Sequence, residues 1–293
     1  MKVVIIGNTG FIGNNIYQNL ESSGKFELIG ISDKEIDLAS EKSDYLLSEY
    51  FSHDCKVIMC AGVKKQLGDT LEIFESNMAI INNFCKAISL VPPQRIIFFS
   101  SASVYGEDVA YSEKITERTP VQPRTFYGIA KYAAERLLEK VCADNNTELV
   151  ILRPSLVYGK DDLSRGYGPT GFTYKAVQNN EIILWGDGSE FREFVYVDDV
   201  GRIVNRIIEH DIKGVVNIVS GKSYSFKQII DSLNNITGSN TKILSRPRTN
   251  EKVNHHYSNE LIKHALGNFD FTCLKDGLKQ TYYSIISELK ANQ

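Results

Sequence analysis

The sequence predicts an α/β protein with a doubly wound parallel sheet, followed by a smaller C-terminal α/β domain. Short apolar runs alternate with longer helical patterns through the first half of the chain, and a glycine-rich turn follows the first run. Uninterrupted apolar strands between helices indicate a parallel sheet that is covered on both faces. Right-handed crossovers between such strands then give a doubly wound fold.

The strands and helices of the first half can be placed in order. Residues 3–6 are four β-branched residues in a row, which is typical of a buried strand. Further strands are expected at residues 26–31, 56–59, 95–99 and 148–152. Apolar residues at helical spacing predict helices over residues 11–20, 71–90 and 127–142.

The pattern changes after residue 152. Residues 159–170 are rich in Gly, Asp and Ser and predict a loop, whereas helical and strand patterns return from residue 171. We therefore expect a larger domain over residues 1–155 and a smaller one over residues 156–293. The division is expected to be discontinuous, because residues 194–219 can return to the first domain.

Composition restricts the class of protein. Of the 293 residues, 42% are hydrophobic and 24% are charged, which is ordinary globular usage and excludes a disordered or fibrous chain. Lys and Arg total 33 against 36 Asp and Glu, so the net charge is −3 and gives no strong attraction to nucleic acid or anionic lipid. Neither nucleic acid nor a membrane is an expected partner.

The five cysteines indicate a reducing compartment. They are odd in number and show no C-x-x-C spacing, so neither a disulfide framework nor a zinc site is expected. No apolar run approaches the ~20 residues that span a bilayer, and the apolar start of the chain is too short for a signal peptide. We expect a cytoplasmic protein without a bound metal.

The glycine-rich turn is the first candidate site. It reads G-x-x-G-x-x-G between the first expected strand and the first expected helix. Glycines there let the chain turn, approach a pyrophosphate and pack helix against strand, while the helix N-terminus attracts the phosphates. This context disfavours a plain strand-to-helix turn and predicts a dinucleotide site. Its expected contacts are Gly7, Thr9, Gly10, Phe11, Ile12 and Gly13.

The end of the second strand selects between NAD and NADP. Asp33 there would bind the ribose 2′-hydroxyl and repel a 2′-phosphate, which favours NAD. If the strand ends one residue earlier, Ser32 faces the ribose and Lys34 can meet a 2′-phosphate, which favours NADP. The spacing from Gly7 is slightly long for Asp33, so NADP is slightly preferred, although Lys34 is equally compatible with a solvated surface lysine.

Tyr127 and Lys131 form a Y-x-x-x-K pattern at the start of an expected helix. Residues four apart share a helix face, so the phenol and the ammonium can reach one site. The ammonium favours the phenolate, and lowering a phenol pKa by about 3 units takes about 4 kcal/mol. Tyr127 can then exchange a proton with an alcohol or a ketone as a hydride moves.

A group of serines, Ser100, Ser101 and Ser103, follows the strand expected at residues 95–99. Ligands bind at this edge of an open α/β sheet, so a serine hydroxyl there can hydrogen-bond the reacting oxygen.

Together these segments resemble an extended short-chain dehydrogenase/reductase of the NAD-dependent epimerase/dehydratase family. The matching segments are residues 7–13, 100–106, 127–131, 152–154, 157–159, 186–188, 192 and 194–200. The resemblance implies a Rossmann domain, a C-terminal substrate domain and nucleotide-sugar chemistry. It also implies a homodimer formed through two helices of each subunit, with residues 71–90 and 127–142 as the candidates. The alternative is that both helices simply cover the sheet.

The resemblance assigns roles to individual residues. Tyr127 resembles the catalytic acid/base, Lys131 the lysine that tunes it and holds the nicotinamide ribose, and Ser101 the catalytic hydroxyl. The residues implied in substrate binding are Ser101, Ser103 as a helper, Tyr127, and, as arginines that grip a diphosphate, Arg192 and Arg248. Alternatively, Arg192 forms a surface ion pair with Glu190 or Glu193. Implied cofactor contacts beyond the glycine turn are Ala61, Gly62, Asn77, Tyr127, Lys131 and Pro154.

The resemblance also limits the reaction. Ala102 and Ser103 stand where sugar-nucleotide 4,6-dehydratases carry an Asp-Glu pair, so dehydration is disfavoured. The preferred interpretation is a 4-ketoreductase that delivers hydride to a 4-keto-deoxysugar nucleotide, and the alternative is a 4-epimerase. A non-catalytic dinucleotide sensor is less expected, because Tyr127 and Lys131 are both present. The product of either enzyme would feed polysaccharide biosynthesis.

Overall fold

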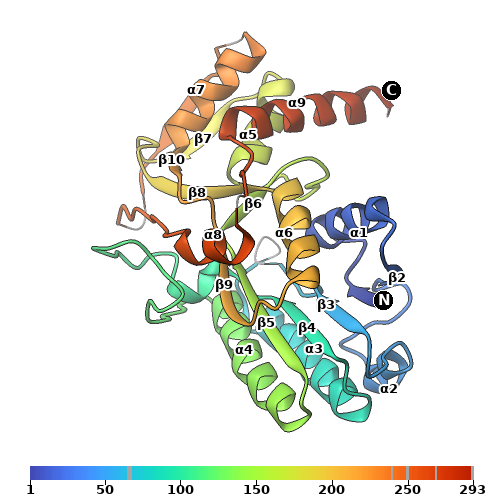
Figure 1. Ribbon diagram of the computed structural model, residues 1–293. Coiled ribbons are helices and arrows are strands. Elements are labelled where there is room, and N and C mark those ends of the chain that lie inside the picture. The colour runs from blue at the N-terminus through green and yellow to red at the C-terminus, as the bar shows by residue number, and fades with distance from the viewer. Residues whose placement is uncertain (65–67, 239, 249–250, 268, 292–293) are drawn as a thin grey trace.

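A computed structural model describes the chain except for residues 65–67, 239, 249–250, 268 and 292–293. Its centre is a six-stranded sheet in the order β2-β1-β3-β4-β5-β9, with all neighbouring strands parallel (Figure 1). The strands are β1 (Lys2–Ile6), β2 (Glu27–Ile31), β3 (Lys56–Met59), β4 (Arg95–Phe99), β5 (Glu148–Pro154) and β9 (Gly214–Ile218). The predicted doubly wound parallel sheet is confirmed.

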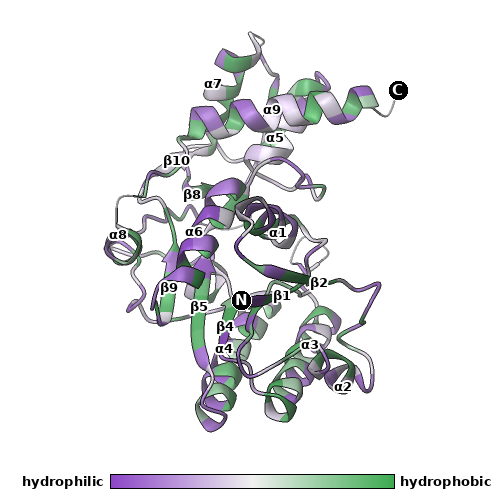
Figure 2. Ribbon diagram, turned by 45° about the vertical axis from the view of Figure 1, so that its right-hand side comes forward, coloured by the Kyte–Doolittle hydropathy of each residue, from purple (hydrophilic) through white to green (hydrophobic). Residues whose placement is uncertain are grey.

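Helices cover both faces of this sheet. One face carries α1 (Phe11–Ser23), α6 (Val197–Glu209) and α8 (Glu260–Leu266), and the other carries α2 (Ser43–Ser48), α3 (Leu71–Leu90) and α4 (Phe126–Asp144). Each face has its own apolar core, because neighbouring strand residues such as Ile5 and Ile6 point to opposite sides. Figure 2 shows these helices with alternating polar and apolar bands around the apolar strands.

The direction of the crossovers changes between β1 and β3. From β1 the chain runs through α1 to β2 on one side, and β3 then pairs on the other side of β1. Such a switch opens a crevice at the carboxyl ends of the two strands, where ligands bind in open α/β sheets. The glycine turn after β1 and the turn after β3 both lie at this point.

A smaller group of strands and helices lies beside the large sheet (Figure 1). It contains a three-stranded sheet of β10 (Ser223–Ser225), β8 (Phe191–Tyr196) and β6 (Leu156–Tyr158), and a parallel pair of β7 (Ile182–Trp185) and β11 (Ile243–Arg246). Its helices are α5 (Pro169–Val177), α7 (Phe226–Thr237) and α9 (Leu274–Ala291). Aromatic side chains dominate its core, among them Tyr158, Phe172, Phe194, Tyr196 and Phe226.

The chain returns from this smaller group to the large sheet after β8. Of residues 194–219, the first three end β8, whereas α6 packs against α1 and β9 pairs with β5. Gly201 of α6 permits this packing, because a Cβ there would lie 2.5 Å from Asn15 Oδ1 of α1. Val195 of β8 also belongs to the apolar core on this face of the large sheet.

The described residues contain no helix that is long and apolar enough to cross a membrane. They also contain no group of three or more His, Cys, Asp and Glu side chains placed to hold a metal ion. All five cysteines are free.

Candidate active site

The glycine turn lies against the ends of β2 and β3. The Gly7 N–H donates to Ile31 O of β2 at 2.7 Å, and Gly7 has a φ of 85°, which favours glycine. A Cβ on Gly7 would lie 2.9 Å from Ala61 N, and one on Gly13 would overlap Gly7 O. Residues with side chains therefore do not fit at Gly7 or Gly13, and α1 begins close against the strand ends.

The start of α1 is open to an anion. Its N-cap is Gly10, so no side chain caps its first N–H groups. Asn8 fills the space left by Gly30 of β2, and its buried Oδ1 has no hydrogen-bond partner among the described residues. The Lys64 ammonium lies 5.9 Å from the centroid of the Phe11 ring. A glycine cradle, an open helix start and an unpaired amide oxygen together fit a dinucleotide.

The carboxylate of Glu35 contacts the end of β2. Ser32, directly after the strand, is buried and donates its N–H to Glu35 Oε2 at 2.8 Å, and its hydroxyl bonds the same oxygen. These bonds lower the pKa of the Glu35 carboxyl. Asp33, Lys34 and Glu35 are all exposed. The contact of Glu35 with Ser32 did not follow from the sequence, because it depends on the turn after the strand.

The turn after β3 lies against α4, the helix that carries Tyr127 and Lys131. A Cβ on Gly62 would lie 3.1 Å from Asn77 Oδ1 and 3.5 Å from Lys131 Nζ. The Asn77 side chain accepts from the Val63 N–H at 2.9 Å and donates to Val63 O at 3.1 Å. Gly62, Asn77 and Lys131 are thus brought together. Pro154, another implied cofactor contact, ends β5 and is buried.

Ser101, Tyr127 and Lys131 also come together. The Lys131 ammonium lies 5.9 Å from the centroid of the Tyr127 ring and donates to Phe99 O of β4 at 2.8 Å. Ser101 caps a short 3-10 helix, η2 (Ala102–Tyr105), and its Oγ accepts from the Ser103 N–H at 3.1 Å. A hydroxyl, a phenol and an ammonium at one sheet edge can move a proton to or from a substrate oxygen.

Burial controls the titration of this cluster. It raises the pKa of the Tyr127 phenol, although a hydrogen bond with Ser101 lowers it. Burial also lowers the pKa of Lys131 to about 8 and raises the pKa of the Cys60 thiol to about 12. The Lys131 ammonium was expected to lower the pKa of Tyr127. In the structure, the effect of burial on that pKa is larger and has the opposite sign.

Glu135 of α4 forms a buried ion pair with Arg153 of β5. Arg153 Nε and Nη2 donate to the Glu135 carboxylate at 2.9 and 2.6 Å, and the Ser100 hydroxyl donates to it at 2.5 Å. Arg153 Nη1 donates to the Tyr105 hydroxyl at 2.9 Å, which donates to Asn217 Oδ1 of β9 at 2.8 Å. Burial lowers the pKa of Arg153, but its bonds to Glu135 outweigh burial and raise it. The network joins α4 to η2, β5, β9 and the residue that follows β4.

Arg192 and Arg248 converge on one carboxylate. Both guanidinium groups form ion pairs with Glu190, and all three side chains are mostly buried. Gly186 makes room, because a Cβ there would lie 2.5 Å from Arg248 Nε. The ion pair of Arg192 with Glu190, which the sequence left open, is present. Glu193 instead accepts from other groups, and burial raises its pKa to about 7.

Residues 253–257 connect the two halves of the site. The Ile115 N–H donates to His256 O at 2.8 Å, and the His255 N–H donates to Phe191 O at 3.1 Å. Ile115 belongs to the loop between η2 and α4, and Phe191 begins β8. The loop after Ser101 and Ser103 is thereby held close to β8, the strand that carries Arg192.

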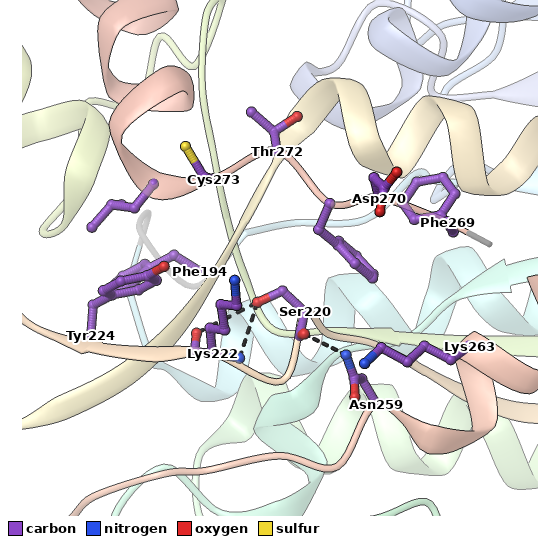
Figure 3. Close-up of a pocket in the computed structure, with 12 residues that line it drawn as sticks. Phe194, Ser220, Lys222, Tyr224, Asn259, Lys263, Phe269, Asp270, Thr272 and Cys273 are labelled. Carbon is purple, nitrogen blue, oxygen red and sulfur yellow. Dashed lines mark hydrogen bonds between the residues drawn. The ribbon is translucent and has the colours of Figure 1, made fainter.

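A cavity of about 200 Å³ lies apart from these groups, between β10, α8 and the start of α9 (Figure 3). Its charged lining residues are Lys222, Lys263 and Asp270, and Cys273 lies on its rim. The Cys273 thiol donates to the Asp276 carboxylate at 3.0 Å. None of the site residues named from the sequence lines this cavity.

The sequence matches the profile of the NAD dependent epimerase/dehydratase family over residues 3–219. The chain belongs to this family. Among curated relatives, GDP-mannose 3,5-epimerase 1 of Oryza sativa subsp. indica is 25% identical over 321 aligned residues, which cover 99% of this chain and 83% of the relative. The resemblance stated from the motifs is confirmed.

Solved structures share the fold of this family member. UDP-glucuronic acid 4-epimerase from Bacillus cereus, solved with UDP-glucuronic acid and NAD, has a TM-score of 0.84 at 21% identity, covering 98% of this chain and 100% of that one. RMD from Pseudomonas aeruginosa, solved with NADPH, has a TM-score of 0.86 at 20% identity, covering 98% and 99%. At these identities the likeness establishes the fold.

Removing the Glu135 charge should destabilise the fold. We expect Glu135→Gln to lower the free energy of unfolding by about 3 kcal/mol, because the Arg153 guanidinium is left buried without its carboxylate. Denaturant unfolding measures this. Glu139→Gln, which removes an exposed ion pair with Arg136 on the same helix, is the control and should cost less than about 0.5 kcal/mol. Equal losses in the two variants would contradict the prediction.

Proposed function

We propose that the chain transfers hydride between NAD(P) and the sugar of a nucleotide-diphosphate sugar, and that it reduces a 4-keto-deoxysugar nucleotide. The observation that carries the proposal is the convergence of Ser101, Tyr127 and Lys131 beside the turn after β3, which packs against the glycine turn. The dinucleotide supplies the hydride. Tyr127 gives its proton to the ketone oxygen, and the Ser101 hydroxyl holds that oxygen by a hydrogen bond.

The cofactor site is proposed at the switch point between β1 and β3. The glycine turn and the start of α1 receive the pyrophosphate, and Lys131, beside Asn77 and Gly62, receives the nicotinamide ribose. Glu35 at the end of β2 favours NAD over NADP, because its carboxylate accepts from a ribose 2′-hydroxyl and repels a 2′-phosphate. This proposal replaces the slight preference for NADP that was expected from Lys34.

Arg192 and Arg248 are proposed to bind the diphosphate of the substrate. Glu190 already holds the two guanidinium groups together, and their burial reduces screening by solvent. An incoming diphosphate takes the place of the Glu190 carboxylate between the two forks. Trp185, beside Gly186 and 45% exposed, offers an aromatic face for the nucleobase.

A nucleotide-sugar 4-epimerase is the second candidate. It is favoured by the likeness of this chain to nucleotide-sugar epimerases, among them the UDP-glucuronic acid 4-epimerase from Bacillus cereus. Ser101, Tyr127 and Lys131 would serve either reaction. In the reductase Tyr127 gives a proton to the ketone, whereas in the epimerase it first takes one from the alcohol.

A homodimer is proposed through α3 and α4. These helices lie side by side over one face of the sheet. Apolar side chains remain exposed on them, namely Leu71, Leu90, Phe126 and Ile129. Burying such groups against a second copy removes apolar surface from water.

The central test is Tyr127→Phe. We expect turnover of a panel of 4-keto sugar nucleotides with NADH or NADPH to fall by about a hundredfold or more, because the proton donor is lost. Dinucleotide affinity, measured by fluorescence titration, should change little. Unchanged turnover would contradict the assignment, and a non-catalytic sensor would show no turnover in either protein.

Glu35 should control the choice of dinucleotide. We expect the protein to bind NADH more tightly than NADPH, and Glu35→Gln to reduce that preference by about tenfold, which corresponds to about 1.4 kcal/mol. Competitive binding titrations measure both values. Asp33→Asn, which removes an exposed charge from the same turn, is the control. A preference that follows Asp33 and not Glu35 would show that Asp33 is the acid facing the ribose.

A further inference from the structure

Ser101 begins a chain of hydroxyl groups that leads away from the catalytic phenol. Its Oγ donates to Ser103 Oγ at 3.1 Å, and Ser103 Oγ donates to Glu107 Oε1 at 2.8 Å. On its other side, Ser101 lies close enough to the Tyr127 phenol for its hydroxyl to lower the pKa of that phenol. Glu107 is partly exposed. The four side chains form a continuous path from the phenol to a carboxylate that solvent reaches.

The backbone around η2 builds this path. The Ser103 N–H holds Ser101 Oγ in place through the N-cap bond. Gly106, with a φ of 90°, then turns the chain, and a Cβ there would lie 2.5 Å from Val109 Cγ2 and 2.6 Å from Gln122 O. This tight turn brings the side chain of Glu107 back onto Ser103.

We propose that Ser103 and Glu107 relay protons between solvent and Tyr127. The inference rests on the proposed function, since a reductase consumes one proton in each turnover. After Tyr127 has protonated the ketone oxygen, the phenolate accepts a proton from Ser101. Ser101 is reprotonated by Ser103, and Ser103 by Glu107, which takes its proton from hydronium.

The relay moves protons and no electrons. At each step one O–H bond breaks and one forms, and the hydride supplies both electrons of the reduction. The hydroxyls then rotate back to donate toward the Glu107 carboxylate, which is the arrangement observed. A 4-epimerase returns the proton that it removes, so it requires no supply of this kind.

Two other charged groups near Tyr127 are unchanged in the variants at Ser103 and Glu107 that test the relay. The Lys131 ammonium lies 5.9 Å from its ring centroid, and Asp69 Oδ1 accepts from its backbone N–H at 3.3 Å. A difference in the pKa of Tyr127 between variants at Ser103 and Glu107 therefore comes from the path through these two side chains.

A double-mutant cycle on the phenol tests the relay. The Tyr127 phenol is titrated by ultraviolet absorbance in NAD-saturated protein, as the difference from Tyr127→Phe. We expect Glu107→Gln to lower the pKa of Tyr127, because the path couples that negative charge to the phenolate. In a Ser103→Ala background the same substitution should have no effect, whereas a Ser103→Thr background should keep the effect.

Glu113→Gln is the matched control, because it removes an exposed carboxylate from the same loop, and it should leave the titration unchanged. In the reduction assay, Glu107→Gln should slow turnover by about tenfold and increase the solvent deuterium isotope effect. No shift from Glu107→Gln, or an equal shift with and without the Ser103 hydroxyl, would overturn the relay. A protein that binds no dinucleotide would overturn the proposed function, while the titration of the free protein would still decide the relay.

Discussion

The buried ion pair of Glu135 and Arg153 is the interaction that orients the catalytic helix. Removing two charges from water is costly, and here the cost is offset by a bidentate pair with further bonds from Ser100 and Tyr105. The pair adds specificity to the packing of α4 against β5. Because Tyr127 and Lys131 lie on the same face of that helix, two turns and one turn earlier, its rotation sets where the phenol and the ammonium point.

Three carboxylates on turns contact the three parts of the proposed site. Glu35 contacts Ser32 at the end of β2, Glu107 ends the hydroxyl path, and Glu190 holds the arginine pair. The sheet and helices thus supply a rigid frame, while turns at its carboxyl edge supply the charges.

The regular spacing of residues in helices and strands made the sheet, its helices and part of the proposed site predictable from the sequence. Residues four apart share a helix face, so the pairing of Tyr127 and Lys131 followed from spacing, and extending that spacing by one turn would have found Glu135. The Glu35 and Glu107 contacts did not follow, because they depend on turn conformations such as that of Gly106. Glu190 and Arg248 are 58 residues apart, with no local signal to join them. The rise in the pKa of Tyr127 depends on burial, which spacing alone does not give.

Identifying the dinucleotide that the purified protein retains is the most direct test of the proposed hydride transfer. The protein is purified without added cofactor and denatured, and any dinucleotide that it releases is identified by mass spectrometry. We expect protein that is largely empty and then binds NADH, as a reductase that exchanges its cofactor in every turnover requires. Stoichiometric tightly held NAD would instead favour the epimerase. No affinity for NAD, NADP or their reduced forms would contradict the proposed function altogether.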